Sequence, residues 1–257
     1  MIFTYKDKAI AYSITGSGPA VVFIHGFLES RHMWEKVLPH LPQYSTLTID
    51  LPGMGDSETL QPIHTMELYA EVINALLRHL KISRVSLVGH SLGGYISLAF
   101  TEMYPEMTER IILINSTFKA DSPERKENRT RAVRLVQERK NAFISMAISN
   151  WVTQESQKEF ATDLEVLKTH AYTFTESGII AALEGMKIRK DRSKVALNFT
   201  KPKHLLLSED DPLIPATETA EEAEKLGFDT RIIAGGHMSV IENLPDIIQY
   251  LKEVLNN

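Results

Sequence analysis

The sequence predicts an α/β protein with a mostly parallel, doubly wound sheet and an inserted helical lid. Two observations predict the sheet: short, continuous apolar runs recur along the chain, and helical patterns separate them, as expected of βαβ units. A third observation predicts the lid, because residues 117–199 read as several helices with no convincing buried strand. We therefore expect a core of residues 1–116 and 200–257 and a lid of residues 117–199. The alternative for the lid segment is a plain helical layer behind the sheet.

The N-terminal residues predict a β-hairpin followed by the first buried strand. Strand-like residues flank the turn Lys6-Asp7-Lys8, and Gly16-Ser17-Gly18-Pro19 then interrupts the pattern. The run Ala20-Val21-Val22-Phe23-Ile24 ends at His25-Gly26 and is typical of a strand buried on both faces of a parallel sheet. The same pattern predicts further strands at residues 46–49, 85–88, 111–114, 205–207 and 231–233.

Apolar residues at helical spacing predict the helices that accompany this sheet. Residues 66–80 carry one apolar stripe, residues 92–104 stop before Pro105, and residues 245–255 form a last amphipathic helix. Within the lid, helices are predicted at residues 123–140, 142–152, 157–169 and 177–186.

Composition excludes several classes of protein and of site. The chain of 257 residues is 43% apolar and 24% charged, near globular averages, which excludes disordered and fibrous proteins. A net charge of −5 argues against nucleic-acid binding, and the lack of any cysteine excludes thiol catalysis and zinc–thiolate sites. No apolar run is long enough to span a membrane and the N-terminus does not resemble a signal peptide, so we expect a cytoplasmic protein.

The strongest chemical signal is the pentapeptide Gly89-His90-Ser91-Leu92-Gly93, which fits the pattern G-x-S-x-G. It directly follows the strand at 85–88 and directly opens the helix at 92–104, which is the context that this motif needs. The glycines allow a tight turn that lifts the hydroxyl of Ser91 above the sheet, and the helix N-terminus offers N–H groups to a developing oxyanion. The alternative is a glycine-rich turn with a helix-capping serine.

A serine nucleophile needs a base, and the base needs an acid that orients it. Among nine histidines, His237 is the best candidate, because it follows a strand through the flexible Gly235-Gly236 at the edge where ligands gather. His90 lies in the motif but is expected to point away. Ordinary surface positions are expected for His40, His64 and His79. No histidine pair has metal-ligand spacing, so no metal site is expected.

The acid should also stand at a strand end. The strand at 205–207 is followed by Glu209, Asp210 and Asp211, which lie between the serine and the histidine in the chain. Such acidic loops are often only solvated, but the position at a strand end favours a functional role for one of the three carboxylates.

Together these residues resemble the α/β-hydrolase superfamily, in particular its lidded, esterase-like branch, over nearly the whole chain outside the lid. The matching elements are His25-Gly26-Phe27, residues 50–57 (Asp-Leu-Pro-Gly-Met-Gly-Asp-Ser), Gly89–Gly94, the Asp211 loop and Gly236-His237. The resemblance implies that Asp211 is the acid, although Ser208 replaces a glycine of the family pattern, and leaves Asp210 as the lesser candidate. It further implies an oxyanion hole from the backbone N–H groups of Leu92 and Phe27. It implies structural roles for His25 and Asp50.

The activity implied by the resemblance is acyl transfer from an ester or thioester of small or medium size to water, without a cofactor. A serine at the elbow argues against the related dehalogenases and epoxide hydrolases, which use an aspartate. An apolar acyl pocket is expected from Phe27 and from Met33, Trp34, Tyr95, Phe118, Phe143, Met146, Trp151 and Met238, although ordinary core packing explains each of them equally well.

The lid segment 122–140 carries seven basic and three acidic side chains in an otherwise acidic protein. A basic lid could receive an acidic carrier protein or an anionic acyl group, as in the pimeloyl-carrier methyl ester esterases that the chain resembles. The alternative is a solvated helix face.

Other activities use the same triad. The menaquinone-pathway synthases, which are lyases or C–C hydrolases by mechanism, resemble the chain in two segments, but Tyr95 stands where they carry an arginine. Perhydrolysis uses the same residues, so the sequence does not distinguish it from ester hydrolysis. A non-catalytic receptor on the same fold is also open, although it would have less need of an intact Ser-Asp-His set.

Overall fold

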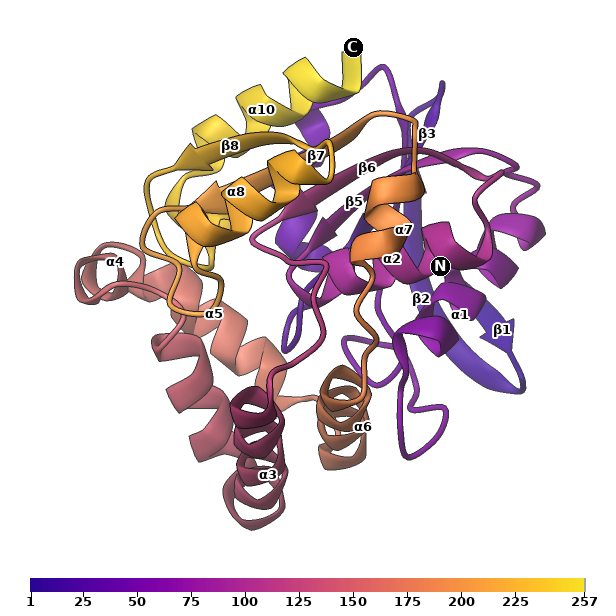
Figure 1. Ribbon diagram of the computed structural model, residues 1–257. Helices are drawn as coiled ribbons and strands as arrows, with labels where there is room; N and C mark the ends of the chain where they lie inside the picture. The colour runs from indigo at the N-terminus through magenta and orange to yellow at the C-terminus, as the bar shows by residue number, and fades with distance from the viewer. Residues whose placement is uncertain (257) are drawn as a thin grey trace.

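A computed structural model describes residues 1–256 as one eight-stranded sheet with helices on both faces (Figure 1). The strand order is β1-β2-β4-β3-β5-β6-β7-β8; β2 pairs antiparallel with β1 and β4, and every other pairing is parallel. The predicted mostly parallel, doubly wound sheet is therefore confirmed. The strands are β1 (Ile2–Tyr5), β2 (Lys8–Thr15), β3 (Ala20–Ile24), β4 (Ser45–Ile49), β5 (Val85–His90), β6 (Thr108–Ile114), β7 (Lys203–Ser208) and β8 (Asp229–Ile233).

The N-terminal hairpin turns over two residues. Tyr5 pairs with Lys8, so that only Lys6 and Asp7 connect β1 to β2. Both have positive φ angles, 48° and 62°, which gives the turn the twist that two-residue hairpins favour.

The central strands are buried on both faces, as their continuous apolar runs predict. In β3, Val21 and Phe23 face one side of the sheet while Val22 and Ile24 face the other, and all four are at most 1% exposed. Strand β8 differs from the prediction, because it is the edge of the sheet and leaves Ile232 43% exposed. An apolar run at an edge packs on fewer neighbours than the same run in the centre.

Each face of the sheet is covered by its own helices. Helices α1 (Met66–His79), α2 (Leu92–Met103) and α8 (Ala216–Lys225) pack on one face. Helix α10 (Leu244–Asn256) and two short 3-10 turns, η1 (Arg31–Trp34) and η2 (Leu38–His40), pack on the other. The short helix α9 (Ser239–Glu242) precedes α10. The predicted helices at 66–80, 92–104 and 245–255 are present within a residue of their expected ends, whereas the sequence reasoning did not identify α8.

The segment between β6 and β7 contains only helices. They are α3 (Pro123–Ser149), α4 (Gln154–Glu159), α5 (Ala161–Tyr172), α6 (Glu176–Lys187) and α7 (Ser193–Asn198). Ser122 caps α3 by accepting the N–H of Arg125, and Pro123 occupies the first turn. The two helices predicted here, at 123–140 and 142–152, are both present within α3, because the backbone at Arg139 (φ −150°, ψ 63°) is not helical and breaks it two residues before the predicted division.

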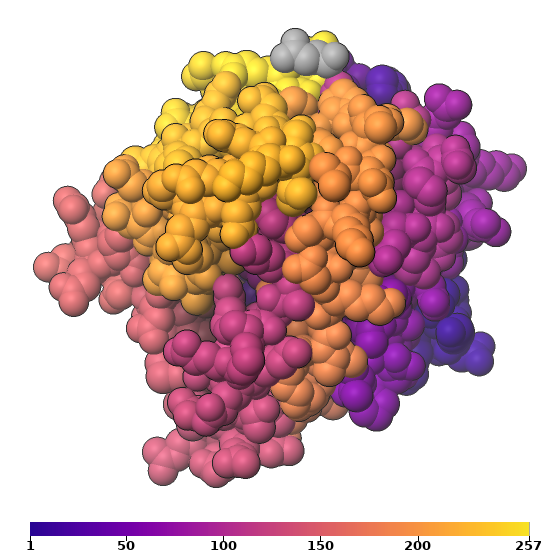
Figure 2. All heavy atoms as spheres, in the orientation of Figure 1, coloured from indigo at the N-terminus to yellow at the C-terminus, as the bar shows by residue number. Residues whose placement is uncertain are grey.

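Helices α3–α6, which we call the cap, lie together at the carboxyl ends of the strands (Figure 1). In the space-filling view the cap forms the lower end of the molecule and meets the C-terminal part of the chain (Figure 2). Helix α7 instead packs on α2 and buries Ala196 among residues of the sheet. The predicted lid thus contains two kinds of helix, those of the cap and one that covers the core.

Two glycines attach the cap to the core. Gly178 and Gly185 stand two turns apart on α6, so they share one face of the helix. A Cβ on Gly178 would overlap the backbone of Gly53, and a Cβ on Gly185 would overlap the carbonyl of His64. The backbone of α6 therefore lies directly against the loop before α1. Among residues 1–256, no helix is long and apolar enough to cross a membrane.

Candidate active site

The candidate site lies at the point of the sheet where the order in which successive strands are added reverses direction. Strand β3 lies between β4 and β5, so the connections after β3 and β5 leave toward opposite sides. Ligands of open α/β sheets bind in the crevice outside the strand ends at such a point. This topology brings the segment after β3, which starts at His25, next to the turn that carries Ser91.

The turn at Ser91 is strained and closely packed. Ser91 has φ 51° and ψ −112°, a conformation that a residue with a side chain rarely adopts. A Cβ on Gly93 would overlap the carbonyl of Ile24, and a Cβ on Gly89 would overlap the backbone of Gly93. The Ser91 side chain makes no capping hydrogen bond to α2, which argues against the alternative of a helix-capping serine.

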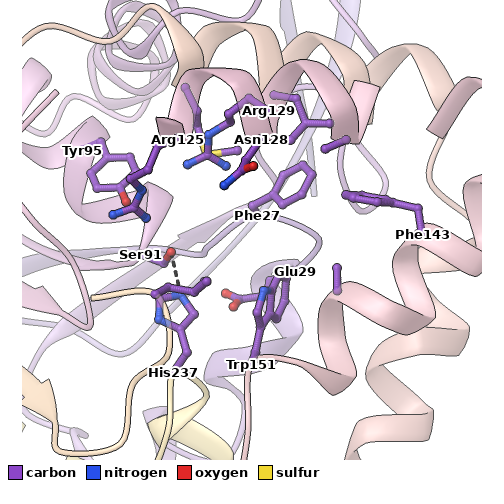
Figure 3. A pocket seen from close by; sticks show the side chains of 15 residues that line it. Phe27, Glu29, Ser91, Tyr95, Arg125, Asn128, Arg129, Phe143, Trp151 and His237 are labelled. Atoms are coloured by element: carbon purple, nitrogen blue, oxygen red, sulfur yellow. Dashed lines mark hydrogen bonds between the residues drawn. The ribbon is translucent and has the colours of Figure 1, made fainter. Parts of the chain in front are cut away.

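The imidazole of His237 connects the serine to a carboxylate. Its Nε2 lies 2.9 Å from Ser91 Oγ (dashed line in Figure 3), and its Nδ1 lies 2.7 Å from Asp211 Oδ2. The backbone N–H of His237 donates to the carbonyl of Trp151 at 2.9 Å, so the cap holds the loop that carries the histidine. The structure thus brings together the three residues that the sequence reasoning selected from three strand ends.

Asp211 is held as a charged, oriented acceptor. Its Oδ2 also accepts from Asn115 Nδ2 at 2.9 Å, and its Oδ1 accepts from the backbone N–H groups of Leu213 (2.8 Å) and Ile214 (3.0 Å). Burial alone would raise the pKa of Asp211, but His237 and these hydrogen bonds outweigh it and hold that pKa below its ordinary value. The neighbouring Asp210 is exposed, as expected of the lesser candidate.

Asn115 is a site residue that the sequence reasoning missed. Besides Asp211 it contacts Ser208 Oγ at 2.9 Å and accepts from Ser239 Oγ at 2.6 Å, which locks its amide in place. It directly follows the buried strand β6, and this position at a strand end was the signal that could have identified it.

Two backbone N–H groups remain the candidates for an oxyanion hole. Leu92 is the first residue of α2, so its N–H has no partner within the helix. Phe27 follows the neighbouring strand β3, and its side chain lines the same pocket as Ser91. Their role stays a prediction.

A buried ion pair between Glu29 and His90, also missed by sequence reasoning, lies next to the triad. Glu29 is 1% exposed; it accepts from the backbone N–H of Gly26 at 2.5 Å and from His90 Nδ1 at 3.0 Å. The other nitrogen of His90, Nε2, lies 2.9 Å from the carbonyl of His237. Since both nitrogens face acceptors, the ring carries both protons. Burial would lower the pKa of His90, but Glu29 raises it above the ordinary value, while the same pairing lowers the pKa of Glu29 against the effect of burial.

Two further buried histidines, His25 and His64, make structural contacts. His25 donates from Nδ1 to Gly26 O and accepts from the backbone N–H of Leu51 at 2.9 Å. His64 is fully buried, not on the surface as expected, and burial lowers its pKa to about 4. It stands in a loop, where exposed residues are usual, but its ring packs on Tyr69 of α1 and its backbone lies against Gly185 of α6.

A pocket of about 240 Å³ opens above Ser91 and His237. Four of the predicted pocket residues line it: Phe27, Tyr95, Phe143 and Trp151. It also has lining residues that the sequence reasoning did not assign to the pocket, and most of them come from the cap: Glu29, Arg125, Asn128, Arg129, Ala132, Ala147, Leu183, Met186 and Leu213. Residues 125, 128, 129 and 132 share one face of α3, a spacing that was visible in the sequence.

Five predicted pocket residues lie elsewhere, which corrects the expectation. Trp34 packs against Phe23 on the opposite face of the sheet, and Phe118 stacks on Phe228. Met146 is 47% exposed on the outer side of α3. The last two, Met33 and Met238, line a separate groove beside α5.

The strand order, the serine turn after β5 and the cap over the strand ends define the class of α/β proteins built on the hydrolase fold. The chain belongs to the alpha/beta hydrolase fold family, whose model matches residues 19–244.

Curated relatives match only part of the chain. It is 37% identical over 99 residues to the uncharacterized hydrolase YugF of Bacillus subtilis, which is 38% of this chain and 36% of that protein. It is 30% identical over 105 residues to a soluble epoxide hydrolase of a Corynebacterium species, which is 40% of this chain and 37% of that protein. The chain spans about a third of the length of the first curated relatives that it matches, 31% to 36%.

Solved structures match the whole fold. A malate-bound esterase of Thermogutta terrifontis is 27% identical with a TM-score of 0.89, over 97% of this chain and 93% of that one. The enol-lactonase of Burkholderia xenovorans LB400 is 20% identical with a TM-score of 0.92 over 100% of both chains, which shows the shared fold.

Proposed function

We propose that the protein is a serine hydrolase that cleaves a carboxylic ester, or a thioester, of a small or medium acyl group. One observation carries this proposal: Ser91 Oγ, both nitrogens of His237 and Asp211 Oδ2 form a continuous hydrogen-bonded chain at the bottom of a pocket. The family membership and the esterase among the similar structures support ester hydrolysis in general.

In the proposed reaction, His237 Nε2 takes the proton of Ser91 as the serine oxygen attacks the ester carbonyl. Asp211, charged and fixed by four hydrogen bonds, holds the imidazole in the tautomer that accepts at Nε2 and stabilises the imidazolium that forms. The backbone N–H groups of Leu92 and Phe27 receive the negative charge that develops on the carbonyl oxygen.

Collapse of the tetrahedral intermediate breaks the bond to the alcohol, which leaves with the proton held by His237. A water molecule then attacks the acyl-enzyme, giving its proton to His237, and the acid product leaves as Ser91 regains its hydrogen. Phe27, Phe143 and Trp151 supply the apolar wall of a pocket whose volume suits a small or medium acyl group and a small alcohol.

The test combines a fluorophosphonate probe with the turnover of p-nitrophenyl acetate and butyrate. We expect the probe to label Ser91, and we expect Ser91→Ala to lower kcat by roughly 10⁵-fold to 10⁶-fold. Ser86→Ala, a change on the same strand β5, is the matched control and should keep full activity. Labelling at another residue, or turnover that survives in Ser91→Ala, would contradict the proposal.

A further inference from the structure

The wall of the pocket that faces the triad is cationic. Arg125, Asn128 and Arg129 descend from α3 on the side opposite Ser91 and His237 (Figure 3). The carboxylate of Glu29 also lines the pocket, but His90 and Gly26 N–H already engage it. The pocket therefore has an apolar part beside the serine and a positively charged part beneath the cap.

A single carboxylate, that of Asp121, is shared by three arginines beside the pocket. The side chain of Asp121, fully buried, accepts from Arg129 Nε at 2.9 Å and Arg189 Nη1 at 2.5 Å, and lies 3.5 Å from Arg125 Nε. The cluster therefore keeps an excess of two positive charges in a partly dehydrated place. Such an excess is costly unless an anion offsets it.

Hydrogen-bond donors in this cluster also lack acceptors. Arg129 uses Nε on Asp121, and no residue in the described range 1–256 accepts from its two Nη groups. Arg189 is 5% exposed, lies 4.1 Å over the ring of Tyr95, and its buried Nη2 has no partner in the same range. Burial lowers the pKa of Arg129, an effect that Asp121 offsets only in part. Arg189 does not line the pocket, but Arg129 does, and a carboxylate in the pocket would accept from the Nη groups of Arg129 in the bidentate geometry that guanidinium groups prefer.

The other basic residues of α3 do not give the outer surface of the helix a comparable excess of positive charge. Lys140 turns inward and donates to the carbonyls of Tyr172 and Phe174, both at 2.8 Å. On the outer side, four exposed bases stand among three exposed acids: Lys126, Arg131, Arg134 and Arg139 with Glu124, Glu127 and Glu138. The charge excess of the segment is thus directed into the pocket, which favours a small anionic substrate over an acidic carrier protein.

We propose that Arg125, Asn128 and Arg129 form a carboxylate subsite, and that the substrate is an ester that also carries a free carboxylate, such as a monoester of a short dicarboxylic acid. The inference rests on the proposed function, since it assigns the substrate class of the same site. The ester carbonyl sits at Ser91 while the remote carboxylate reaches the cap. Asp121 stays in place as the partner that keeps the arginines oriented.

The test compares two substrates of nearly equal shape, monomethyl adipate and the methyl ester of adipic acid monoamide. Release of methanol is measured, and the ratio of kcat/KM for the acid to that for the amide is the readout. We expect a ratio above 10 in the unaltered protein. A ratio of 1 or less would overturn the proposal.

Variants then locate the effect. Arg125→Gln and Arg129→Gln should each lower the ratio at least tenfold, whereas Arg131→Gln, an outward arginine of the same helix that pairs with Glu127, should leave it unchanged. Far-UV circular dichroism checks folding, and Arg125, one third exposed, is the substitution that disturbs the core least. An unchanged ratio in a folded Arg125→Gln protein contradicts the subsite.

A binding measurement separates this inference from the proposed function. Calorimetric titration of the Ser91→Ala variant with monomethyl adipate should show binding that is at least tenfold weaker when Arg125→Gln is added. If p-nitrophenyl acetate is not turned over but this binding difference is present, the ester hydrolysis fails and the carboxylate subsite stands. If p-nitrophenyl acetate is turned over but neither the binding nor the kcat/KM ratio changes in the arginine variants, the carboxylate subsite is wrong and the proposed function stands.

Discussion

Asp211 differs from Asp210 in one decisive respect, the direction in which its side chain points. Both follow the same strand, but Asp211 turns inward to His237 and Asn115 while Asp210 is exposed. The orientation follows from the turn itself, because the N–H groups of Leu213 and Ile214 fold back onto Asp211 Oδ1.

This contrast predicts a matched pair of substitutions. Asp211→Asn should lower kcat roughly 10⁴-fold, because an amide in that place favours the wrong tautomer of His237. Asp210→Asn should leave kcat within twofold of the unaltered protein. Steady-state kinetics on p-nitrophenyl butyrate checks both. If the large loss of kcat occurs in the Asp210 variant instead, then Asp210 is the acid of the triad.

The pair Glu29–His90 ties three parts of the site together. Glu29 holds Gly26 N–H beside the oxyanion candidate, while His90 precedes the serine and holds the carbonyl of His237. We infer that these two act as positioning residues, since neither takes part in the proton transfers.

The stability conferred by this pair should depend on pH. The pKa of Glu29 is lowered in the folded protein, so its contribution is present above the ordinary value of 4.5 and is lost as pH falls through the folded pKa. The pKa of His90 is raised, so its contribution is full below 6.5 and is lost as pH rises through the folded pKa. Between pH 4.5 and 6.5, Glu29→Gln should therefore cost about 3–5 kcal/mol of unfolding free energy, and less at higher pH. Urea unfolding across pH measures this, with the exposed Glu35→Gln as the control; a cost that does not change with pH would argue against a charged pair.

Much of the residue-scale site was predictable, and the reason is the strand end. Ser91 and Asp211 each stand directly or shortly after an apolar run, which marks a place at the ligand-binding edge of the sheet. Pocket membership was not predictable in the same way. Trp34 and Phe118 are as apolar as Phe143, and only the packing of whole elements decides which of them meets the cavity.

At the scale of elements, the attachment of α6 is the feature that positions the cap. Gly185 brings the helix backbone against His64, so a side chain there has no room. A glycine-to-alanine change in an open helix stabilises by about 0.4–1 kcal/mol. Here we expect the opposite sign, a loss of about 1–3 kcal/mol from overpacking.

Chemical unfolding of Gly185→Ala checks this sign. Ser177→Ala, an exposed change on the same helix, should alter the free energy of unfolding by no more than about 0.5 kcal/mol. A Gly185→Ala protein more stable than the original would show that α6 shifts away from the loop at little cost.

Element boundaries were predicted less well than element types. The sequence reasoning divides α3 at residue 141, and the backbone leaves helical geometry two residues earlier, at Arg139. The residues around the bend are charged and show no apolar periodicity, so the sequence pattern does not indicate there whether the helix is continuous. Helix α8 was missed for a related reason, since it buries only small side chains such as Ala216, Ala220 and Ala223.

For the whole molecule, the cap and core share one hydrophobic cluster. Val136, Phe143 and Ile179 of the cap belong to the same buried cluster as Leu28 and Tyr95 of the core. Because this apolar surface is buried between cap and core, the unfolding of either part would expose apolar surface of the other.

We therefore expect one cooperative unfolding transition. In differential scanning calorimetry, the ratio of calorimetric to van't Hoff enthalpy should be close to 1, and the midpoint by circular dichroism should coincide. Two separate transitions would mean that the cap unfolds alone.

The contact between cap and catalytic loop also gives the molecule an optical property. The indole of Trp151 lies edge-on to the imidazole of His237, with ring centroids 6.1 Å apart, whereas Trp34 is buried on the far face of the sheet. Since Trp151 also lines the pocket, its fluorescence should respond when a ligand enters beside Ser91, whereas that of Trp34 should not, so the chain carries its own indicator of occupancy.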